Sequence, residues 1–574
     1  MKKQWQMLHP DEQTVRLLER ETGCPPLIAR LLAIRGIFTG CQAKRFLTPL
    51  LRDLASPLEM TGIPAAVDRI HRALTAREKI LVFGDYDADG VTATAVLVSF
   101  LRQCGARVVY HIPYRMADGY GLGADFINGR ARRIGTNLII TVDCGSSSHE
   151  AVRLASQLGI DTIVTDHHPV DRAPEAAVAV INPSGPDGQA GLAHLAGVGV
   201  AFYLVVALRA HLREKGFWQS RPEPNLKQLC DLVALGTVAD VSPLILDNRT
   251  LTAAGLEQIN GGFRPGIRAL MRTSGAPEAS ADAQTIAFKL APRINAAGRM
   301  AHARMACELL LTDDRRKANR LAAALGRLNG RRQAMESDLL QSILDRFDRR
   351  PKLLDRPVLV VHGNHWHAGV LGIVASRLAR QFHRPSIVLA TSNGTAKGSA
   401  RSVEGIDISA ALSRCEDLLD RFGGHPLAAG LGLATDRLDD FTSRLEAVVE
   451  EMAARRETGP TLSIDAHLPL DGVTPELMEG LERLGPFGQG NPHPLFVDTG
   501  IRVKECRTVG ESHRRMVLES GQSGNGALPA IQFNVPENLP VADRFEKIAY
   551  RPQWNHWNGK KHLQVVIEDV VPEP

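Results

Sequence analysis

Paired cysteines are missing from this sequence. Its eight cysteines, at positions 24, 41, 104, 144, 230, 307, 415 and 506, are scattered, and none forms a Cys-x-x-Cys pair. Without such pairs we expect reduced, mostly buried thiols, as in a cytoplasmic protein, rather than a disulfide framework.

Apolar segments long enough to enter a membrane are missing as well. No stretch reaches the roughly 18–20 consecutive apolar residues of a spanning helix. The opening residues, MKKQWQMLHPDEQ, lack the apolar core of a signal peptide. We therefore expect no membrane contact and a cytoplasmic location.

The sequence has little excess charge, no internal repeat and no low-complexity tract. Lys plus Arg number 68 and Asp plus Glu 63, which gives a formal net charge of +5. This balance permits contact with nucleic acid but does not require it, because the site itself can be acidic. With 574 residues, 44% of them hydrophobic and 23% charged, the chain is predicted to be globular, with three or four domains.

Short apolar runs alternate with helix-like stretches between residues 80 and 182. The run ILVF precedes the loop GDYDADG and the helical stretch VTATAVLVSFLRQCG, and the runs NLIITV, TIVT and AVAVI follow. Apolar runs that alternate with helices are typical of parallel strands buried on both faces. The sequence therefore predicts an α/β fold with a parallel sheet, in which ligands bind at the carboxyl ends of the strands.

The rest of the chain shows other patterns. Residues 1–60 look helical, and residues 315–347 have the apolar spacing of a long helix, with LNG at 328–330 expected to weaken or kink its middle. A second α/β pattern begins at PVLVVHG and ends near residue 455, where the polar stretch ARRETGPTLS predicts a linker. Short strands and turns follow. Asn558-Gly559, ahead of alternating apolar residues, predicts a β-hairpin.

Acidic residues directly follow three of the predicted strands, and a fourth apolar segment, CDLVALGTVADVSPL, carries two more. The residues concerned are Asp85, Asp87, Asp89, Asp143, Asp166, His167, His168, Asp231 and Asp240. If the strands are parallel neighbours, their acidic ends converge on one rim of the sheet. Carboxylates so close together repel and raise one another's pKa unless cations neutralise them.

Each motif alone has an ordinary structural explanation. Asp-x-Asp after a strand is often a helix N-cap or an Asx turn, and His-His is often part of a capped turn. Three consecutive strand ends of the same kind favour a metal site instead. Carboxylates with one or two imidazoles suit Mn²⁺ or Mg²⁺ better than Zn²⁺. We expect His167 to be a ligand and His168 to point toward the substrate.

The motifs GDYDADG, TVDCG, VTDHH and ALGTVADVSPL resemble those of the DHH phosphoesterase family. More closely, DGYGL, LAGVGVAFYL, APRINAAGRM, WHAGVLGIVASRL, GSARS and FGGHPLAAG resemble the RecJ branch of bacterial single-stranded-DNA exonucleases. The resemblance runs from about residue 25 to the C-terminus. Two positions depart from the pattern: Ala400 stands where glycine is usual, and Cys144 where asparagine is common. Neither removes a ligand, but Ala400 is expected to alter slightly the approach of the backbone to a phosphate.

The resemblance implies an α/β protein of five parts. We expect a helical segment over residues 1–60, a DHH catalytic domain with a parallel sheet over 61–312, a connecting helix over 313–350, a second α/β, DHH-associated substrate-binding domain over 351–458, and an oligonucleotide-binding β-barrel over 459–574. GSARS and FGGHPLAAG are expected to form glycine-rich turns that approach phosphate groups.

The resemblance also implies a site with two Mn²⁺ or Mg²⁺ ions. The implied metal ligands are Asp85, Asp87, Asp89, Asp143, His167 and Asp240. The implied catalytic residues are Asp143, Asp166, His167 and His168. His168 either contacts the scissile phosphate or leaving group, or only orients Asp143 or His167. Asp231 is either a further ligand, a residue that supports the ligands, or a helix cap.

The implied DNA contacts lie in several domains. They are Arg293, Arg299, Arg377, Ser399, Arg401, Ser402, Gly423, Gly424 and His425. Arg377 is equally well explained as a solvated arginine on a helix face. In the barrel, Trp554 and Trp557 either stack on bases or pack the hairpin, and Arg514, Arg515, Lys560 and Lys561 are candidate backbone contacts.

The implied activity is 5′→3′ hydrolysis of single-stranded DNA to 5′-mononucleotides, in recombination and repair. The implied partners are single-strand-binding protein and a helicase, and the protein is expected to be a monomer. The same metal core serves pyrophosphatases, oligoribonucleases and cyclic-dinucleotide phosphodiesterases, but those enzymes generally lack the terminal barrel. A catalytically silent DNA-binding scaffold predicts eroded acidic motifs, and here all of them are intact.

Overall fold

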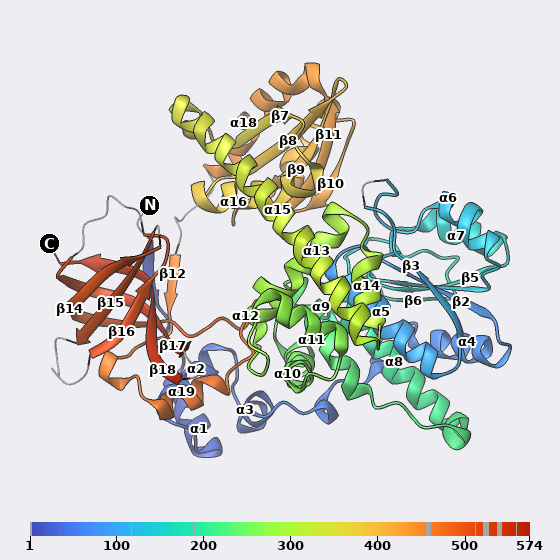
Figure 1. Ribbon diagram of the computed structural model, residues 1–574, viewed down its shortest axis with the longest axis horizontal. Coiled ribbons are helices and arrows are strands. Elements are labelled where there is room, and N and C mark those ends of the chain that lie inside the picture. Colours follow the sequence, from blue (N-terminus) through green and yellow to red (C-terminus); the bar gives the residue numbers. More distant parts are fainter. Residues whose placement is uncertain are drawn as a thin grey trace.

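Three large β-sheets surround a helical middle layer (Figure 1). The computed structural model describes residues 3–115, 117–188, 190–454, 461–510, 512–520, 527–535, 542–557 and 560–573. Across these ranges, no helix combines the length and apolar content that crossing a membrane requires. All eight cysteines are unpaired, and five of them are buried, as the sequence predicted.

The first large sheet is parallel throughout and has the strand order β3-β2-β4-β5-β6. Its strands are β2 (Lys79–Gly84), β3 (Arg107–His111), β4 (Leu138–Val142), β5 (Asp161–Thr165) and β6 (Ala179–Ile181). Alternate residues of a strand face opposite sides of the sheet: Ile80 and Val82 join one buried core, while Leu81 and Phe83 join another. Both faces are therefore covered, which confirms the predicted α/β architecture.

Helices build the two layers around this sheet and the middle of the molecule. They are α4 (Ile63–Thr75), α5 (Ala88–Gln103), α6 (Ala124–Phe126), η3 (Ile127–Ala131), α7 (His149–Gln157), η4 (Ala190–Leu192), α8 (Gly197–Glu214), η5 (Phe217–Ser220), η6 (Leu226–Leu229), α9 (Cys230–Ala239), α10 (Leu246–Gly261), α11 (Pro265–Ser274), α12 (Ala283–Thr285), η7 (Ile286–Leu290), α13 (Ala291–Met300) and α14 (Arg304–Leu311).

The long helix α15 (Arg315–Arg349) joins this region to the second α/β region, as the sequence predicted. Asp314 caps its N-terminus by accepting hydrogen bonds from the backbone N–H groups of Arg316 and Lys317. Its first half packs through Leu325 on the core that contains Ile80 and Val82 of the first sheet, and its second half packs on the next region through Phe347. The helix is continuous through residues 328–330, where a weak point was expected.

The second large sheet has the order β10-β11-β9-β8-β7, with β7 and β8 parallel and the other pairs antiparallel. Its elements are η8 (Pro351–Asp355), β7 (Leu359–Asn364), α16 (Ala368–Phe382), β8 (Ser386–Ser392), β9 (Thr395–Arg401), α17 (Ile408–Ser413), η9 (Glu416–Leu418), β10 (Arg421–His425), β11 (Ala428–Ala434), η10 (Thr435–Arg437) and α18 (Leu438–Ala453). The prediction that GSARS and FGGHPLAAG are turns is wrong, because both lie mainly in paired strands. Two of their glycines allow close strand packing: a Cβ on Gly398 would lie 2.0 Å from the carbonyl oxygen of Val388, and one on Gly424 would lie 2.3 Å from that of Ala428.

The third large sheet closes into a five-stranded barrel through the pairing of β14 with β17, as the resemblance implied. Its elements are β12 (Thr461–Ile464), β13 (Ala466–His467), η11 (Leu470–Gly472), α19 (Pro475–Glu482), β14 (Phe496–Val509), β15 (His513–Ser520), β16 (Ala527–Gln532), β17 (Arg544–Trp557) and β18 (Lys560–Pro572). Strands β17 and β18 are antiparallel. The predicted turn Asn558-Gly559, and residues 455–460 of the predicted linker, lie outside the described residues.

The N-terminal segment does not stand alone, and it is not wholly helical. Its elements are β1 (Gln4–Met7), α1 (Glu12–Thr22), α2 (Pro26–Ile34), α3 (Gly40–Leu47), η1 (Leu51–Asp53) and η2 (Pro57–Glu59). The expectation of a purely helical segment is wrong for residues 4–7, because β1 pairs in parallel with β12, which lies more than 450 residues later in the chain. Leu18 and Leu31 share one buried core with Phe496 and Tyr550 of the barrel.

Candidate metal centre and substrate cleft

The acidic strand ends meet because their strands are neighbours. Asp85 follows β2, Asp143 follows β4, and Asp166 follows β5, and these three strands are adjacent and parallel. Asp89 comes from the first turn of α5, and Asp240 is the C-cap of α9, which packs against α5. The carboxyl edge of the sheet therefore collects acids from four segments of the chain.

Local backbone geometry fixes these side chains. Asp87 caps α5 by accepting hydrogen bonds from the N–H groups of Asp89 and Gly90, at 2.9 and 3.1 Å. Asp143 has a positive φ of 61°, a left-handed conformation that a non-glycine residue adopts at some cost in energy. The N-terminus of α8 closes the site, because Gly197 donates its N–H to Asp89 at 2.7 Å. A Cβ on Gly197 would lie 2.5 Å from Oδ1 of Asp143, so only glycine fits there.

Three overlapping groups of ligand atoms lie close enough to hold cations. In each group the candidate atoms are within 4.8 Å of one another. The groups are Asp143, His167 and His168; Asp89, His167 and Asp240; and Asp85, Asp87 and Asp143. Nε2 of His167 lies 3.1 Å from Oδ1 of Asp143 and 3.7 Å from Oδ2 of Asp89. Because the groups share members, they form one continuous centre.

The centre has the properties of a cation site. Oδ1 of Asp85, Oδ1 of Asp143 and Nε2 of His167 are buried and have no hydrogen-bond partner. Burial, followed by the charge of Asp89, raises the pKa of Asp143 well above its ordinary value. The pKa values of Asp85 and Asp89 are raised in the same way, by burial and then by neighbouring carboxylates. Divalent cations would offset the repulsion and the cost of burying these carboxylates, and they would occupy the unused ligand atoms. The residues present therefore fit Mn²⁺ or Mg²⁺.

His168 and Asp166 form a charged pair at the edge of the centre. Nδ1 of His168 lies 2.7 Å from Oδ1 of Asp166, which also accepts the backbone N–H of His167. Burial alone would lower the pKa of His168, but the hydrogen bond and charge of Asp166 raise it to about 9. Burial would raise the pKa of Asp166, but its hydrogen bonds, first of all to His168, lower it. His168 is therefore a cation at neutral pH, able to donate to a phosphate.

Asp231 does not join the centre. Its carboxylate pairs with the guanidinium of Arg264, with Nε to Oδ2 at 2.7 Å and Nη2 to Oδ1 at 3.1 Å. Nine residues separate it from Asp240, about 2.5 turns of helix, which places the two at opposite ends of α9. Among the alternatives for Asp231, this geometry favours a structural role.

A cluster of arginines faces the centre from several elements. Burial, and then the charge of Arg115, lowers the pKa of Arg299 to about 10, and Arg401 also acts on it. Arg299 reaches the second α/β region by donating to the carbonyl of Gly369, at 3.3 Å. Arg401 and Ser399 lie together against Gly372 of α16. Arg299 and Arg401 therefore bring positive charge from two domains to one place, and Asp87 is close enough to act on the pKa of Arg299.

The other predicted DNA contacts differ in their surroundings. Arg377 pairs with the buried Glu336 of α15 at 2.7 Å, which holds α16 against the long helix. Ser402 donates its hydroxyl to the carbonyl of Ile406, at 2.6 Å. Arg293 donates to the carbonyl of Lys289, at 2.6 Å, and its Nε is buried without a partner.

A cavity of about 590 Å³ joins the two α/β regions beside the centre. Gly424 and His425 of β10 line it from one side, and Asp166, His168 and Tyr120 line it from the other. Gly423 precedes them in the same exposed strand. This cavity is therefore the natural cleft for a substrate that reaches the centre.

The two departures from the family pattern do not touch the cleft. Ala400 is fully buried in the core of the second sheet, so its methyl group does not face the side of β9 that carries Ser399 and Arg401. The expectation that Ala400 alters the approach to a phosphate therefore finds no support in its position. Cys144 is also fully buried, with its thiol directed at the carbonyl of Val142 at 3.6 Å.

The barrel tryptophans were predicted either to stack on bases or to pack. Trp554 is half-buried against the barrel core, with Nζ of Lys561 4.2 Å from the centre of its ring. It also lines a cavity of about 730 Å³ between the barrel and α12. The side chain of Trp557 lies outside the described residues.

Two residues near the centre, Arg115 and Tyr120, were not predicted from the sequence. Arg115 lies 4.7 Å from the ring centre of Tyr86, next to the acidic loop, and Tyr120 places its hydroxyl 3.2 Å from Nδ1 of His168. Both belong to the loop after β3: Arg115 precedes the motif DGYGL, and Tyr120 is the tyrosine of that motif. An exposed tyrosine between glycines was the signal that could have identified the loop.

Known families cover most of the chain. Residues 79–237 match the N-terminal domain of the DHH family, residues 355–451 match the DHHA1 domain, and residues 464–569 match the RecJ OB domain. These three regions contain the three large sheets.

Individual proteins are similar to this chain over most of its length. The single-stranded-DNA-specific exonuclease RecJ of Salmonella typhimurium is 40% identical over 567 residues, covering 96% of each chain. The crystal structure of Thermus thermophilus RecJ in complex with Mn²⁺ has a TM-score of 0.84 and 32% identity, covering 100% of this chain and 80% of that one. The same protein in complex with Mg²⁺ has a TM-score of 0.76 and 31% identity, with 100% and 78% covered. The chain therefore belongs to the RecJ family of single-stranded-DNA-specific exonucleases.

Proposed function

We propose that the protein is a metal-dependent exonuclease that hydrolyses single-stranded DNA from the 5′ end to 5′-mononucleotides. The observation that carries this proposal is the set of buried, unpartnered ligand atoms on adjacent strand ends, beside a cavity between the two α/β regions. The 5′ polarity, a cytoplasmic location, a role in recombination and repair, and a monomeric state are proposed from the family resemblance. The family resemblance also suggests that the protein acts together with single-strand-binding protein and a helicase.

The proposed metal ligands are Asp85, Asp87, Asp89, Asp143, His167 and Asp240. Two divalent cations, Mn²⁺ or Mg²⁺, would neutralise charge on the phosphate and lower the pKa of the attacking water. The protein's own contribution is positional. The N-terminus of α8 and the cap on α5 hold the carboxylates, and Asp166 keeps His168 protonated. In this proposal His168 donates to the scissile phosphate or the leaving oxygen.

The DNA path is proposed to run through the cleft between the two α/β regions. Arg299, Arg401 and Ser399 would bind phosphate groups near the 5′ end, together with Gly423, Gly424 and His425 on β10 of the same sheet as Ser399 and Arg401. Their charge and proximity to the centre support this assignment. Arg293 and Ser402 are proposed as further contacts, and Trp554 as a contact for DNA that leaves the cleft. Arg377 contributes less in this proposal, because Glu336 already pairs with it.

One assay tests the proposed function directly. The purified protein is incubated with Mn²⁺ and 5′- or 3′-labelled single-stranded DNA, double-stranded DNA or short RNA. We expect mononucleotides to be released from the 5′ side of single-stranded DNA only. Activity confined to dinucleotides would replace the proposal with an oligoribonuclease or cyclic-dinucleotide phosphodiesterase function. No hydrolysis of any substrate would favour a silent DNA-binding scaffold.

The two acids of α9 provide a matched pair of variants. Asp240→Asn is expected to reduce kcat/KM about a hundredfold, equivalent to about 2.7 kcal/mol, because it removes a carboxylate from the centre. Asp231→Asn should leave kcat/KM within about threefold of the wild type. It should lower the free energy of unfolding by about 3 kcal/mol, because Arg264 loses its buried partner. Steady-state kinetics and urea unfolding measure both, and the reverse pattern would place Asp231 in the centre.

The pH profile tests the role of His168. Its pKa of about 9 means that the side chain is charged below that pH and neutral above it. With Mg²⁺ as cofactor, kcat/KM is expected to fall toward tenfold per pH unit above pH 9, because the phosphate loses a charged donor. His168→Gln should be about a hundredfold slower at pH 7.5 and show no such fall. If the variant keeps the wild-type pH profile, His168 is not the titrating group.

A further inference from the structure

The outer face of the long helix α15 carries a row of arginines. Arg316, Arg320, Arg327 and Arg331 follow one another at intervals of four, seven and four residues, so they lie on one face of the helix, and all four are exposed. At about 1.5 Å per residue, the distance from the first to the last is about 22 Å. These four residues form the arginine row.

Neighbouring side chains do not neutralise the arginine row. Across the described ranges, none of its four side chains makes a hydrogen bond or an ion pair. Lys317, which points elsewhere on the same helix, is by contrast paired with Glu308 at 3.4 Å. Cations gathered in one line create a positive potential that attracts an anionic partner, and salt weakens that attraction.

Charge is separated along this face of the helix. Beyond Arg331, the next charged residues on the same face are Asp338 and Asp345, and both are exposed. A solvated helix face more often mixes the two signs, because opposite charges three or four residues apart stabilise a helix. The separation therefore marks residues 316–331 as a bounded basic surface.

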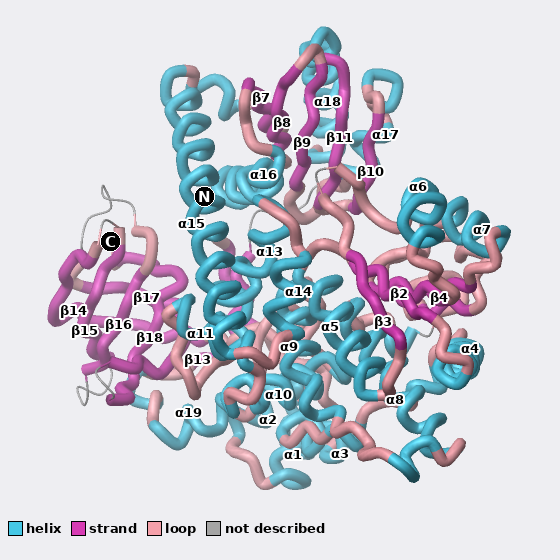
Figure 2. Tube along the Cα trace, turned by 45° about the vertical axis from the view of Figure 1, so that its right-hand side comes forward, coloured by secondary structure: helices cyan, strands magenta, loops and turns pink. Residues whose placement is uncertain are grey.

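The arginine row faces away from the catalytic side of the helix. Ala318 and Leu325, which α15 buries, lie on the opposite side. Arg332 lies on that inner side too: it pairs with Glu336 at 2.8 Å and lowers the pKa of Arg299. In Figure 2, α15 runs along the edge of the helical middle layer, from the second α/β region down to α11. The row is therefore a surface separate from the metal centre and its cleft.

The chemistry of the arginine row fits a DNA backbone. A guanidinium group can bind a phosphate through two parallel N–H groups. A strand with stacked bases has a phosphate about every 3.4 Å, so the length of the row corresponds to roughly six phosphates. Residues 316–331 include no aromatic side chain on which a base could stack. Contact is therefore expected with the backbone alone.

We propose that the arginine row binds single-stranded DNA outside the cleft, through phosphate contacts that do not depend on the base sequence. The row holds a stretch of the strand that is not being hydrolysed, and so keeps a long substrate close to the centre. The choice of single-stranded over double-stranded DNA rests on the proposed exonuclease function. The binding itself requires no hydrolysis and can be measured without it.

Fluorescence anisotropy of the full-length protein in EDTA tests the proposal. The probe is a labelled strand of thirty dT nucleotides, and the row variant combines Arg316→Ala, Arg320→Ala, Arg327→Ala and Arg331→Ala. We expect at least tenfold weaker binding by the row variant. The slope of log affinity against log salt concentration should become less steep by about 2.8, because each phosphate contact to a single strand contributes about 0.7.

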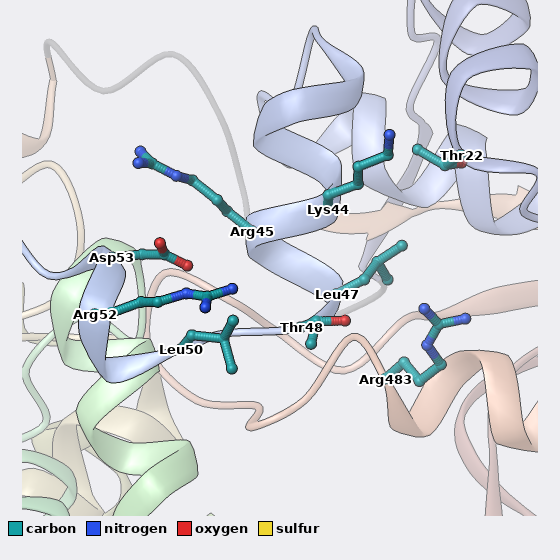
Figure 3. A pocket seen from close by; sticks show the side chains of 9 residues that line it. All are labelled: Thr22, Lys44, Arg45, Leu47, Thr48, Leu50, Arg52, Asp53 and Arg483. Atoms are coloured by element: carbon teal, nitrogen blue, oxygen red, sulfur yellow. The ribbon is translucent and has the colours of Figure 1, made fainter.

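A matched control removes four arginines elsewhere. Arg16 and Arg20 lie one turn apart on α1, and Arg45 and Arg52 line the basic pocket shown in Figure 3. Alanine at these four exposed positions makes the same change in net charge, and it should leave the affinity within about twofold of the wild type. Alanine is a strong helix former, so both variants should fold, which circular dichroism melting checks.

Kinetics provide a second measurement. With Mn²⁺, the row variant should have a KM for the thirty-nucleotide strand at least fivefold above the wild type, with kcat unchanged, because the metal centre is untouched. The KM for a strand of six nucleotides should not change. An unchanged KM for the long strand would contradict the proposal.

Three binding results would overturn the proposal. One is unchanged affinity in the row variant. Another is an equal loss in the control variant, which would indicate a general effect of charge. The third is displacement of the DNA by polyglutamate at an equal concentration of charge, which would make the row a surface for acidic proteins. Tighter binding of a duplex, lost in the row variant, would assign the row to double-stranded DNA instead. If no substrate is hydrolysed, the proposed function fails, while the binding measurements still decide this proposal.

Discussion

Asp143→Asn is expected to lower the rate of single-stranded DNA hydrolysis by about a thousandfold or more, equivalent to roughly 4 kcal/mol. Asp143 belongs to two of the three ligand groups, and its Oδ1 is one of the buried atoms that have no partner. Its left-handed backbone conformation shows that the chain accepts strain to place this carboxylate. The loss should appear mainly in kcat, because the variant removes charge at the reacting centre and leaves Arg299 and Arg401 in place to bind the substrate.

A carboxylate at the other edge of the same sheet provides the control. Asp161 begins β5, pairs with Arg69, and is remote from the carboxyl ends of the strands. Asp161→Asn should therefore retain activity within about twofold of the wild type at a temperature where the protein is folded. Single-turnover assays with labelled DNA measure both variants. Full activity in Asp143→Asn would remove the proposed centre from the mechanism.

Divalent cations are expected to raise the thermal stability, and more strongly at pH 8 than at pH 6. Asp85, Asp89 and Asp143 have raised pKa values in the folded protein, so the folded state holds protons that the unfolded state has released. Without cations, the contribution of these groups to stability therefore falls as pH rises above the ordinary carboxyl pKa. Cations bind the deprotonated form, so the stabilisation that they provide grows in the same direction.

The expected size follows from mass action. Mn²⁺ at about a hundred times its dissociation constant stabilises the folded state by about 2.7 kcal/mol, or roughly 5–10 °C in Tm for a domain of this size. Calorimetry with EDTA or with MnCl₂ at the two pH values measures the effect, and EDTA should also abolish hydrolysis. Asp143→Asn should lose most of the increase. Equal stabilisation at both pH values would contradict the titration argument, and no stabilisation would contradict the metal site.

The parts of this structure that could be predicted from the sequence are those with a local signal. The apolar runs that precede Asp85, Asp143 and Asp166 predicted parallel neighbouring strands. Such strands can be recognised because the apolar run and the polar residues that end it are adjacent in the sequence. The distance between Asp231 and Asp240 could also be predicted, because nine residues of helix make about 2.5 turns. The sequence alone left three roles open for Asp231: a further ligand, a residue that supports the ligands, or a helix cap.

Other features had no local signal. The meeting of Arg115, Arg299 and Arg401 depends on how α15 sets one domain against another, and no short motif encodes that angle. Glycines in FGGHPLAAG indicate either turns or close strand packing, and composition alone cannot separate the two. The pairing of β1 with β12 joins segments more than 450 residues apart. Such contacts are specified by the complementary surfaces of finished domains.

The shared core of the N-terminal helices and the barrel has a consequence for biosynthesis. Leu18 and Leu31 leave the ribosome long before Phe496 and Tyr550, their partners in that core. At about 5–20 residues per second, the interval of more than 450 residues lasts roughly half a minute to a minute and a half. During that time the apolar face of α1 and α2 has no permanent cover, so the nascent chain must be shielded from aggregation until its last domain emerges.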